Sequence, residues 1–314
     1  MALLLCTGNW KPESWIEAFA RAAPGRTILT HGIDDYDPAA IRYAATWRPP
    51  EGLLASLPNL AVIFNLGAGV DALMTDGTLP DVPIVRLVDD DLTWRMGEWV
   101  ALQVLTHHRR ALTYLDQQRR HLWQDLRPQP AAREVRVGLM GHGVLARHAA
   151  SVLLAVGYEV HAWARSGREA DVTLYVGAER LADFLAATDI LVCLLPLTAE
   201  TAGILDGVLI DGLARDGALG GPVLVNAGRG GLQNEADIRS ALLDGRLLGA
   251  SLDVFTTEPL PPEDPLWDAP NLVITPHNSA ISEPDAVARY VARQIETFES
   301  GGALRNVVAR DRGY

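Results

Sequence analysis

Short apolar runs, separated by longer amphipathic stretches, recur along the whole chain. The first set is ALLLC, TILTH, YAATW, LAVIFNL and PIVRLV, and the second is VRVGLMG, YEVHAWA, ILVCLLP, PVLVNAG, LLGASLDV and NLVITP. Runs of this length between turn residues are typical of β-strands, and the stretches between them are typical of helices. The second set is apolar nearly throughout, which indicates parallel strands covered on both faces. The pattern predicts an α/β protein with two doubly wound, Rossmann-like parallel-sheet domains and a cleft between them.

Two segments are expected to cross between these domains. The first is a long helical pattern from about Met96 to Trp123, which follows the turn-like DDDLTWR. The second is NSAISEP, which leads into the amphipathic stretch DAVARYVARQIETFESG. If that last helix returns to the first domain, residues 1–95 plus 281–314 form a flavodoxin-like substrate domain and residues 96–280 form the dinucleotide-binding domain.

Charge and cysteine content narrow the class of protein. The 27 Lys and Arg residues against 39 Asp and Glu give a formal charge of −12, which disfavours nucleic acid and anionic membrane surfaces as partners. No basic leader and no apolar stretch near the ~20 residues of a membrane span are present. Cys6 and Cys193 both lie in predicted strands and cannot form a disulfide framework. We expect a cytoplasmic protein with no nucleic-acid or membrane partner.

The segment VGLMGHGVLARHAASVLLAVG reads as strand, turn and helix, and its turn matches G-x-G-x-x-A. Gly141 allows the tight turn, Gly143 lets a pyrophosphate approach the backbone, and Ala146 permits close helix packing. Val144 and Leu145 open the helix, whose N-terminus would face the phosphates. This placement predicts a dinucleotide-binding turn.

The next strand ends where an NAD-binding protein usually has an acidic residue that binds the ribose. That position, about 20 residues past the turn, is Ala164. It is followed by Arg165, Ser166 and Arg168, which can pair with a 2′-phosphate through charge-assisted hydrogen bonds. The alternative is a solvated basic loop. The residues favour NADP(H), and NAD(H) stays open as a second cofactor.

A second glycine turn, FNLGAGVDAL, also joins a predicted strand to a helix. The backbone N–H groups around Gly67, Ala68 and Gly69 could form a nest for a small anion such as a substrate carboxylate. A plain strand-to-helix turn is the alternative.

Three further strand ends carry polar side chains that suit reduction of a 2-oxo acid. They are Arg229 in VNAGRGG, Glu258 in LDVFTTEPL and His277 in ITPHNSA. Ligands collect at the carboxyl ends of strands in doubly wound sheets, so the three could converge. An arginine can hold the carboxylate and polarise the carbonyl, and a histidine can donate a proton to the new alkoxide. A carboxylate beside the imidazole orients it and favours its protonated form. The alternatives are that Arg229 is a turn residue, Glu258 a surface residue and His277 a capping residue.

These motifs, in this order, resemble the D-isomer-specific 2-hydroxyacid dehydrogenase family over almost the whole chain. The resemblance rests on NLGAGVD, the G-x-G-x-x-A turn, LLPLTAET, VNAGRGG, LDVFTTEPLP and TPH. It implies that Leu195 and Pro196 flank the adenosine and that Asp253 contacts the nicotinamide amide. It needs no metal. The long helix, with Trp99, Leu102 and Leu105, is similar to the family's dimer-forming element, which implies a homodimer, although a buried intrachain helix fits the spacing equally well.

Within the family, YAATWRPP, WARSGR, MGEWV and ARDRGY resemble a subgroup of NADPH-preferring reductases of glyoxylate and hydroxypyruvate. This implies that Trp47 stands at the substrate pocket, while a core aromatic remains the alternative. The chain departs from the subgroup after His277, because Glu283 stands where an arginine is usual. If Glu283 lies near the pocket mouth, it would disfavour substrates with a second negative group.

Residues and resemblance together predict an NADPH-dependent reductase that converts glyoxylate to glycolate and hydroxypyruvate to D-glycerate, with His277 as the proton donor. Two alternatives stay open. One is a reductase of bulkier 2-keto acids, which differs only in the shape of its pocket. The other is a dinucleotide-sensing binding protein that acts through partners.

Overall fold

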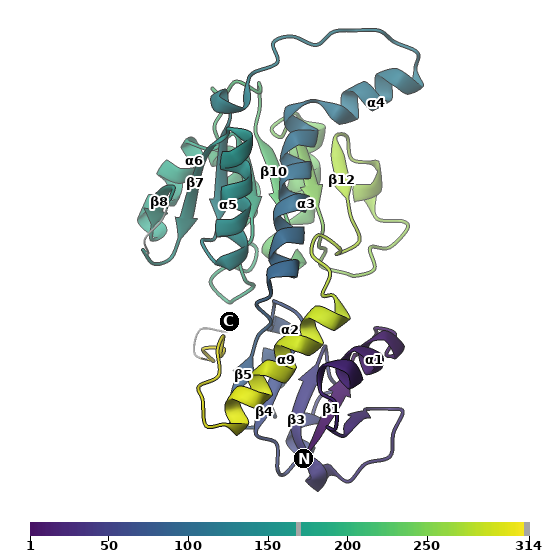
Figure 1. Ribbon diagram of the computed structural model, residues 1–314. Coiled ribbons are helices and arrows are strands. Elements are labelled where there is room, and N and C mark those ends of the chain that lie inside the picture. The colour runs from purple at the N-terminus through teal and green to yellow at the C-terminus, as the bar shows by residue number, and fades with distance from the viewer. Residues whose placement is uncertain (168–170, 311–314) are drawn as a thin grey trace. The chain divides into compact units, whose positions relative to one another are not determined.

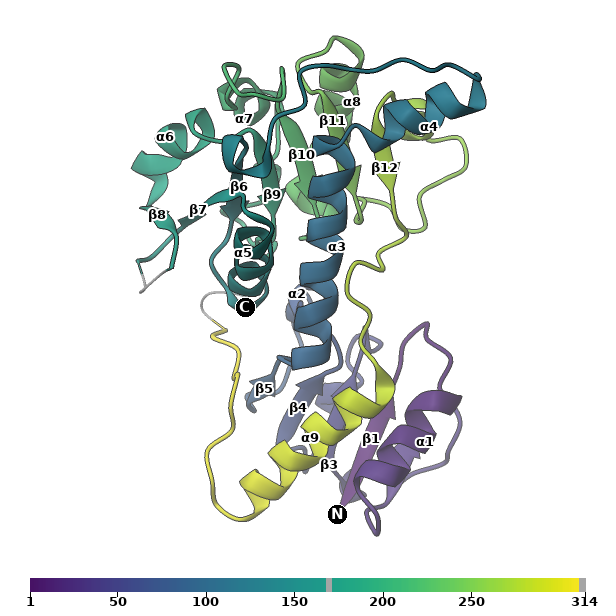
Figure 2. The same ribbon diagram turned by 45° about the horizontal axis from the view of Figure 1, so that its top comes forward.

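The computed structural model describes residues 1–167 and 171–310 (Figures 1 and 2). The chain forms two compact units. The first contains residues 1–92 and the chain from Ile281 onward, and the second contains Thr93–Ala280.

The first unit is built on a parallel sheet with the strand order β2-β1-β3-β4-β5. Its strands are β1 (Ala2–Cys6), β2 (Ile28–Thr30), β3 (Ile41–Thr46), β4 (Val62–Asn65) and β5 (Ile84–Val85). All five residues of β1 are buried, as its apolar run predicts. The helices are α1 (Glu13–Ala22), α2 (Asp71–Met74) and α9 (Pro284–Glu299).

Helices α1 and α9 lie side by side in both ribbon views. Helix α9 buries one apolar face, made of Val287, Ala288, Val291, Ala292 and Ile295. Their pairing is supported at the surface, where Arg21 Nη2 lies 2.8 Å from Asp285 Oδ1. The last helix of the chain therefore belongs to the first unit, although it follows the strands of the second.

The second unit is built on a parallel sheet with the strand order β12-β11-β10-β9-β6-β7-β8. The strands are β6 (Arg136–Met140), β7 (Glu159–Ala164), β8 (Thr173–Val176), β9 (Ile190–Cys193), β10 (Val223–Asn226), β11 (Gly249–Leu252) and β12 (Leu272–Ile274). The strand order reverses between β6 and β9, which makes this the topological switch point where doubly wound sheets bind nucleotides. The two parallel sheets confirm the predicted fold class.

Helices cover the second sheet, with apolar cores packed against it. They are α5 (Val144–Val156), α6 (Leu181–Ala186), α7 (Gly207–Gly212), α8 (Glu235–Leu243) and most of α3 (Asp90–His108). Helix α4 (Ala111–Arg119) follows α3 and contributes no residue to these cores. Short 3₁₀ turns span Pro38–Ala40, Leu54–Ser56, Ala132–Glu134, Ala178–Arg180, Gly230–Leu232 and Pro265–Asp268.

The helix predicted from about Met96 to Trp123 is wrong in its bounds and in its continuity, because the structure has two helices, Asp90–His108 and Ala111–Arg119. Helix α3 begins at Asp90, because the Asp89 carboxylate accepts the N–H groups of Asp91 and Leu92, at 3.0 and 3.4 Å, and caps the first turn. Arg110 has a φ of +54°, in the left-handed region, so the chain bends there before α4 begins. Strand β8 was also missed, because it lies at the sheet edge and its sequence TLYV is only partly buried.

A buried polar chain fixes α3 on the second sheet. His107 Nε2 lies 2.8 Å from Ser251 Oγ in β11, and Ser251 Oγ donates to Gln103 Oε1 at 2.9 Å. Burial lowers the pKa of His107 from 6.5 to about 4, so the ring is neutral at pH 7. Gly249 is required beside it, since a Cβ there would lie 2.5 Å from His107 Nδ1.

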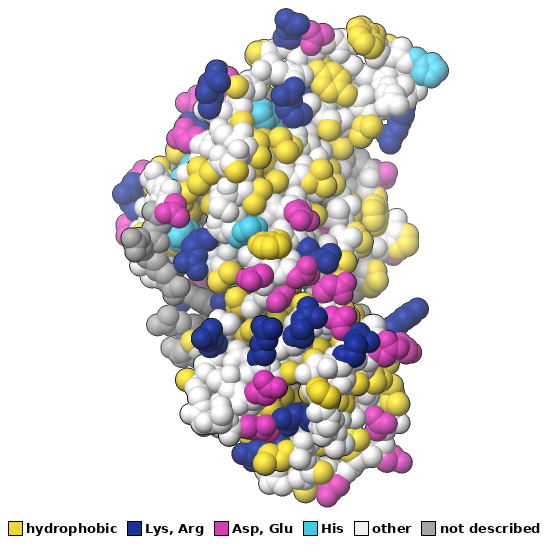
Figure 3. All heavy atoms as spheres, viewed as in Figure 1, with side chains coloured by type: hydrophobic (Ala, Val, Ile, Leu, Met, Phe, Trp, Pro, Cys, Tyr) yellow, Lys and Arg dark blue, Asp and Glu magenta, His cyan; other side chains and the backbone are white. Residues whose placement is uncertain are grey.

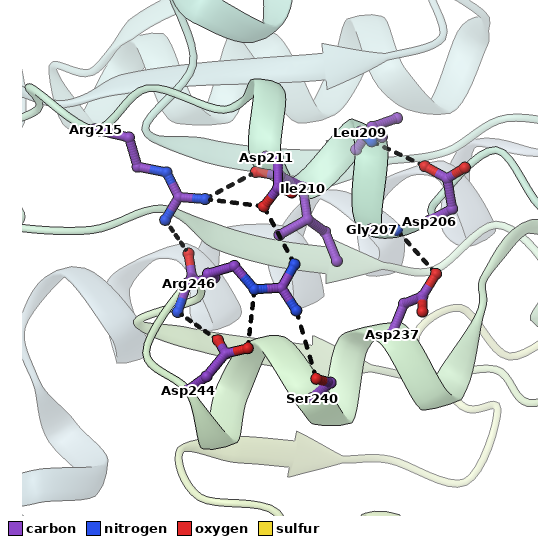
Figure 4. Close-up of polar contacts among 10 residues, drawn as sticks. All are labelled: Asp206, Gly207, Leu209, Ile210, Asp211, Arg215, Asp237, Ser240, Asp244 and Arg246. Atoms are coloured by element: carbon purple, nitrogen blue, oxygen red, sulfur yellow. Dashed lines mark hydrogen bonds and ion pairs between the residues drawn. The ribbon is translucent and has the colours of Figure 1, made fainter.

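Polar contacts on the surface join α7, α8 and the turn after α8, as Figure 4 shows. Arg246 links α7 to the C-terminal end of α8, with Nη1 3.1 Å from Asp211 Oδ1 in α7 and Nε 2.9 Å from Oδ2 of Asp244, the C-cap residue of α8. Asp237 in α8 accepts the N–H of Gly207 at 2.9 Å. These groups are solvent-exposed, so each ion pair contributes little to stability.

Candidate functional site

The predicted trio follows three neighbouring strands of the second sheet. Strands β10, β11 and β12 pair in sequence, with Asn226 opposite Leu252 and Leu252 opposite Ile274. Arg229, Glu258 and His277 lie in the loops that leave the carboxyl ends of these strands. The sheet topology therefore brings the three loops to one edge of the unit.

His277 and Glu258 are in direct contact. His277 Nδ1 lies 2.9 Å from Glu258 Oε2 and 3.0 Å from Oε1. The His277 side chain is 32% exposed and the Glu258 side chain 22%, so the pair is accessible but largely shielded. The contact occupies Nδ1 and leaves the second ring nitrogen, Nε2, as the one that can exchange a proton with a ligand.

The loop that carries His277 is organised around Asp253, which is fully buried. The Asp253 carboxylate accepts hydrogen bonds from Thr275 Oγ1 at 2.5 Å, Asn278 N at 2.9 Å and Ser279 N at 3.0 Å. The Asp253 carbonyl accepts the N–H of His277 at 2.8 Å. These bonds hold His277 at a φ of +52°, which is uncommon for a residue with a side chain.

The Arg229 loop is fixed by the last residue of β10. Asn226 Oδ1 accepts the N–H of Gly228 at 2.9 Å, and Asn226 Nδ2 donates to the Arg229 carbonyl at 3.2 Å. The Arg229 guanidinium donates to the Gly228 carbonyl at 2.7 Å, among other contacts. Gly230 packs on the next loop so closely that a Cβ would lie 2.0 Å from the carbonyl of Phe255.

The G-x-G-x-x-A turn lies at the switch point, between β6 and α5. Gly141 has a φ of +109°, and a Cβ there would approach the Leu194 carbonyl to 3.3 Å. Gly143 is the N-cap of α5 and has no side chain that could cap the first turn, and a Cβ on it would meet no protein atom within 4 Å. Ala146 is buried, while Val144 and Leu145 are partly exposed. Free space at a helix N-terminus fits a pyrophosphate.

Arg165 and Ser166 follow the end of β7 and are exposed. Arg165 Nη1 lies 3.4 Å from Glu200 Oε2, in an exposed ion pair. Arg168 lies outside the described residues. Leu195 is only 9% exposed and packs in the core, whereas Pro196 is partly exposed and its carbonyl accepts from Thr201 Oγ1 at 2.7 Å.

In the first unit, the second glycine turn follows β4 and is shaped by a buried asparagine. Asn65 Nδ2 donates to the carbonyls of Gly67 and Gly69, at 2.7 and 2.9 Å. Both carbonyls therefore face Asn65. Within the described part of the chain, the N–H groups of Ala68 and Gly69 donate to no protein acceptor. Its carbonyls point to Asn65 while two of its N–H groups have no acceptor among the described residues, which is the arrangement that an anion-binding nest requires.

Trp47, which follows β3, packs against this turn. A Cβ on Gly67 would lie 2.4 Å from Trp47 Cζ3, so only glycine fits. The Trp47 ring stacks on Trp10, with ring centroids 4.7 Å apart and an interplanar angle of 12°. Trp15 stacks next, at 5.1 Å and 11° from Trp10. Trp47 is partly exposed.

Sequence reasoning missed the residues that shape these loops. Asn65 and Asn226 are each the last residue of an apolar run, and Gln233 follows the Arg229 turn. Their signal was a single amide side chain at or just past a buried strand end. Such a residue must find hydrogen-bond partners in its own loop or in a neighbouring one.

Two classes of feature are absent from residues 1–167 and 171–310. No cluster of three or more His, Cys, Asp or Glu side chains that could bind a metal ion occurs there. In the same ranges, every helix is too short or too polar to cross a membrane.

Comparison with known proteins gives a consistent result. Residues 101–279 match the family model described as D-isomer specific 2-hydroxyacid dehydrogenase, NAD binding domain. A glyoxylate/hydroxypyruvate reductase A from Salmonella paratyphi B is 39% identical over 307 residues, which cover 96% of each chain. An NADPH-dependent glyoxylate/hydroxypyruvate reductase from Sinorhizobium meliloti, crystallised with NADP and sulfate, is 45% identical, with complete coverage of both chains and a TM-score of 0.95. A D-isomer specific 2-hydroxyacid dehydrogenase from Xanthobacter autotrophicus Py2, crystallised with NADPH and MES, is 37% identical, covers 100% of this chain and 99% of its own, and has a TM-score of 0.93.

Proposed function

Because the chain belongs to the D-isomer-specific 2-hydroxyacid dehydrogenase family, we propose that it reduces small 2-oxo acids with NADPH. Glyoxylate and hydroxypyruvate are the proposed substrates, with glycolate and D-glycerate as products. The observation that carries the proposal is the His277–Glu258 contact of 2.9 Å, at the same sheet edge as the Arg229 loop.

The cofactor proposal rests on the fit of this chain's own residues. The open space at Gly143 and the uncapped start of α5 suit a pyrophosphate, with Gly141, Val144 and Leu145 completing the turn. Arg165 and Ser166 follow the strand end that lacks an acid, so they suit a 2′-phosphate. Solved relatives that are 45% and 37% identical are complexes with NADP and NADPH. Arg168 belongs to the same proposal, and NADH remains a weaker second cofactor.

The remaining cofactor contacts come from the resemblance. We propose that Leu195 and Pro196 flank the adenosine and that Asp253 contacts the nicotinamide amide. Three of the acceptor sites of the Asp253 carboxylate are already used by Thr275, Asn278 and Ser279 in the loop that carries His277, so the first role of Asp253 is to hold that loop. When bound, NADPH supplies the hydride that reduces the 2-oxo carbon.

The protein's groups then have separate tasks. Arg229 binds the carboxylate and polarises the carbonyl, because a guanidinium presents paired donors to planar oxygen groups. The N–H groups of the Gly67–Ala68–Gly69 turn bind the carboxylate as well, beside Trp47. His277, oriented through Nδ1 by Glu258, donates the proton to the new hydroxyl from Nε2.

Steady-state kinetics over a panel of 2-oxo acids with NADPH and NADH tests this function. We expect turnover of glyoxylate and hydroxypyruvate, and a loss of kcat of about 10²-fold or more in His277→Ala, the usual scale for a general acid. Arg229→Ala should be at least as damaging, since it loses both anchoring and polarisation. Arg246→Ala, in the exposed contacts of Figure 4, is the control and should keep wild-type kinetics.

The same panel separates the alternatives. Preference for larger side chains at C3 would identify a reductase of bulkier 2-keto acids. Tight NADPH binding without oxidation of NADPH by any 2-oxo acid would refute the reductase proposal and favour a dinucleotide-sensing binding protein.

A finer proposal concerns Glu283, the exposed N-cap residue of α9. We propose that its charge disfavours substrates with a second carboxylate. Glu283→Arg should then raise the ratio of oxaloacetate to hydroxypyruvate turnover, and an unchanged ratio would discard the idea.

We further propose a cytoplasmic homodimer, with residues 1–95 plus 281–314 as the substrate domain and 96–280 as the dinucleotide domain. Leu102 is 59% exposed, and Leu115, Leu122 and Trp123 are also exposed, so α3, α4 and the segment that follows carry exposed apolar side chains, which are scattered among polar ones on the face that Figure 3 shows. Trp99 is instead buried in the core of its unit. Light scattering after gel filtration tests the dimer, and a monomeric mass would refute it.

A further inference from the structure

One buried glutamine connects the loops that carry Arg229 and Glu258. Gln233 is 6% exposed and lies just after the 3₁₀ turn Gly230–Leu232. Its Oε1 accepts Asn226 Nδ2 at 2.8 Å, and its Nε2 donates to the Val254 carbonyl at 2.8 Å. Asn226 ends β10 and Val254 follows β11, so this single side chain spans two neighbouring strand ends.

On the β10 side, Gln233 determines how the Asn226 amide is oriented. The Gln233 oxygen is an acceptor, so the NH₂ group of Asn226 must face it, and the Asn226 oxygen faces the Gly228 N–H. The same NH₂ group donates to the carbonyl of Arg229. With the Gln233 oxygen removed, the buried amide of Asn226 loses the partner that fixes this orientation.

On the β11 side, Gln233 acts together with Glu235. Gln233 Nε2 lies 3.3 Å from Glu235 Oε1, and that oxygen also accepts the backbone N–H and the hydroxyl of Thr256, both at 2.8 Å. The neighbouring Phe255 N–H donates to Glu258 Oε1 at 3.1 Å. The segment from Val254 to Glu258 is therefore held by Gln233 and Glu235, which follow Arg229 in the chain.

We propose that Gln233 is a positioning residue for the reaction, which acts through the Arg229 and Glu258 loops and does not touch the substrate. The inference rests on the proposed function. Its physical basis is that an error of ~1 Å in the placement of a reacting group can cost about 10²-fold in rate. A leucine at position 233 fills similar space but cannot hold either loop by hydrogen bonds.

The first experiment compares Gln233→Leu with Gln103→Leu. Gln103 is also a buried glutamine of the same unit, and its side chain accepts from Ser251 in β11 rather than from the loops of Arg229, Glu258 or His277, so it controls for the loss of a buried amide. We expect both variants to lower Tm, while only Gln233→Leu lowers kcat/KM, by ~10- to 100-fold. It should also weaken the binding of oxalate, measured by calorimetry, because Arg229 is displaced. Equal kinetics and oxalate binding in the two variants would overturn the inference.

A double-mutant cycle distinguishes positioning from a general defect. If Gln233 acts through Arg229, adding Gln233→Leu to Arg229→Ala should cost much less than it costs in the wild type. Equal losses in both backgrounds would overturn the inference. If Gln233→Leu does not fold, Gln233→Met, which keeps the length of the side chain, is measured against the same expectations.

Failure of the function is recognised separately. A wild type that reduces no 2-oxo acid refutes the proposed function, and the inference with it. A wild type that is active, and is disabled by His277→Ala but not by either Gln233 variant, refutes the inference alone.

Discussion

Replacing Asp253 by Asn tests whether one carboxylate holds the His277 loop. Asp253 Oδ1 accepts Thr275 Oγ1 and Asn278 N, and Oδ2 accepts Ser279 N. An asparagine offers one oxygen and one NH₂ group in the same space. In one orientation the NH₂ group faces the Ser279 N–H, and in the other it faces the remaining two donors. Either way, at least one buried or partly buried donor loses its acceptor.

The size of the effect follows from these contacts. A hydrogen bond to a charged group contributes ~1.5–3 kcal/mol, and a buried donor left unsatisfied costs ~1–3 kcal/mol. The neutral amide is easier to bury than the carboxylate, which offsets part of this loss. We expect Asp253→Asn to lower the free energy of unfolding by about 2 kcal/mol. Since His277 is held at positive φ by this loop, kcat should fall by ~10- to 100-fold.

Urea unfolding and steady-state reduction of glyoxylate measure the two effects. Thr275→Val is the matched variant, because it removes one of the three donors and keeps the carboxylate. It should lose less in both measurements. If Asp253→Asn unfolds at the wild-type urea concentration and keeps the wild-type kcat, the loop does not depend on the carboxylate and the reasoning is wrong.

Three other perturbations have defined outcomes. Gly67→Ala places a Cβ 2.4 Å from Trp47 Cζ3, so it should displace the indole, cost ~1–3 kcal/mol in a thermal melt and raise KM for glyoxylate; a wild-type KM would separate Trp47 from the substrate. Arg165→Ala should raise KM for NADPH at least about tenfold and leave KM for NADH nearly unchanged, since a phosphate contact of ~1.5–3 kcal/mol is lost; parallel changes would contradict the 2′-phosphate assignment. Burial lowers the pKa of His107 to about 4, below its ordinary 6.5, so the unfolded state binds the proton first as pH falls. The stability that His107 contributes above pH 6.5 should therefore be lost between pH 6.5 and 4, by up to roughly 3 kcal/mol, and His107→Gln should flatten that slope in urea titrations.

The strands of this fold could be predicted because each is a nearly continuous apolar run. Strand β8 could not, since an edge strand buries only part of its surface and TLYV carries a weak signal. The start of α3 could not be predicted from the sequence for another reason. Three consecutive aspartates read as a turn, and only the structure shows that Asp89 caps the helix that its neighbours begin.

The candidate site could also be predicted only in part. Arg229, Glu258 and His277 lie in the segments that follow three apolar runs, so their shared edge of the sheet follows from parallel topology. The direct His277–Glu258 contact does not follow, because it depends on the path of the loops. The sequence did not predict the three amides that support the loops, which are Asn65, Asn226 and Gln233. Their partners are mostly backbone groups, and the pattern of side chains along the chain does not indicate such contacts.

The stack of Trp15, Trp10 and Trp47 gives the first unit an intrinsic spectroscopic signal. Parallel indoles separated by 5.1 and 4.7 Å share their excitation, so their near-ultraviolet circular dichroism and emission depend on the stacking geometry. Trp47 is the member in contact with Gly67, and any ligand that shifts this ring will change the signal. A ligand that binds at the glycine turn and shifts Trp47 would therefore be detected without a dye, a label or turnover.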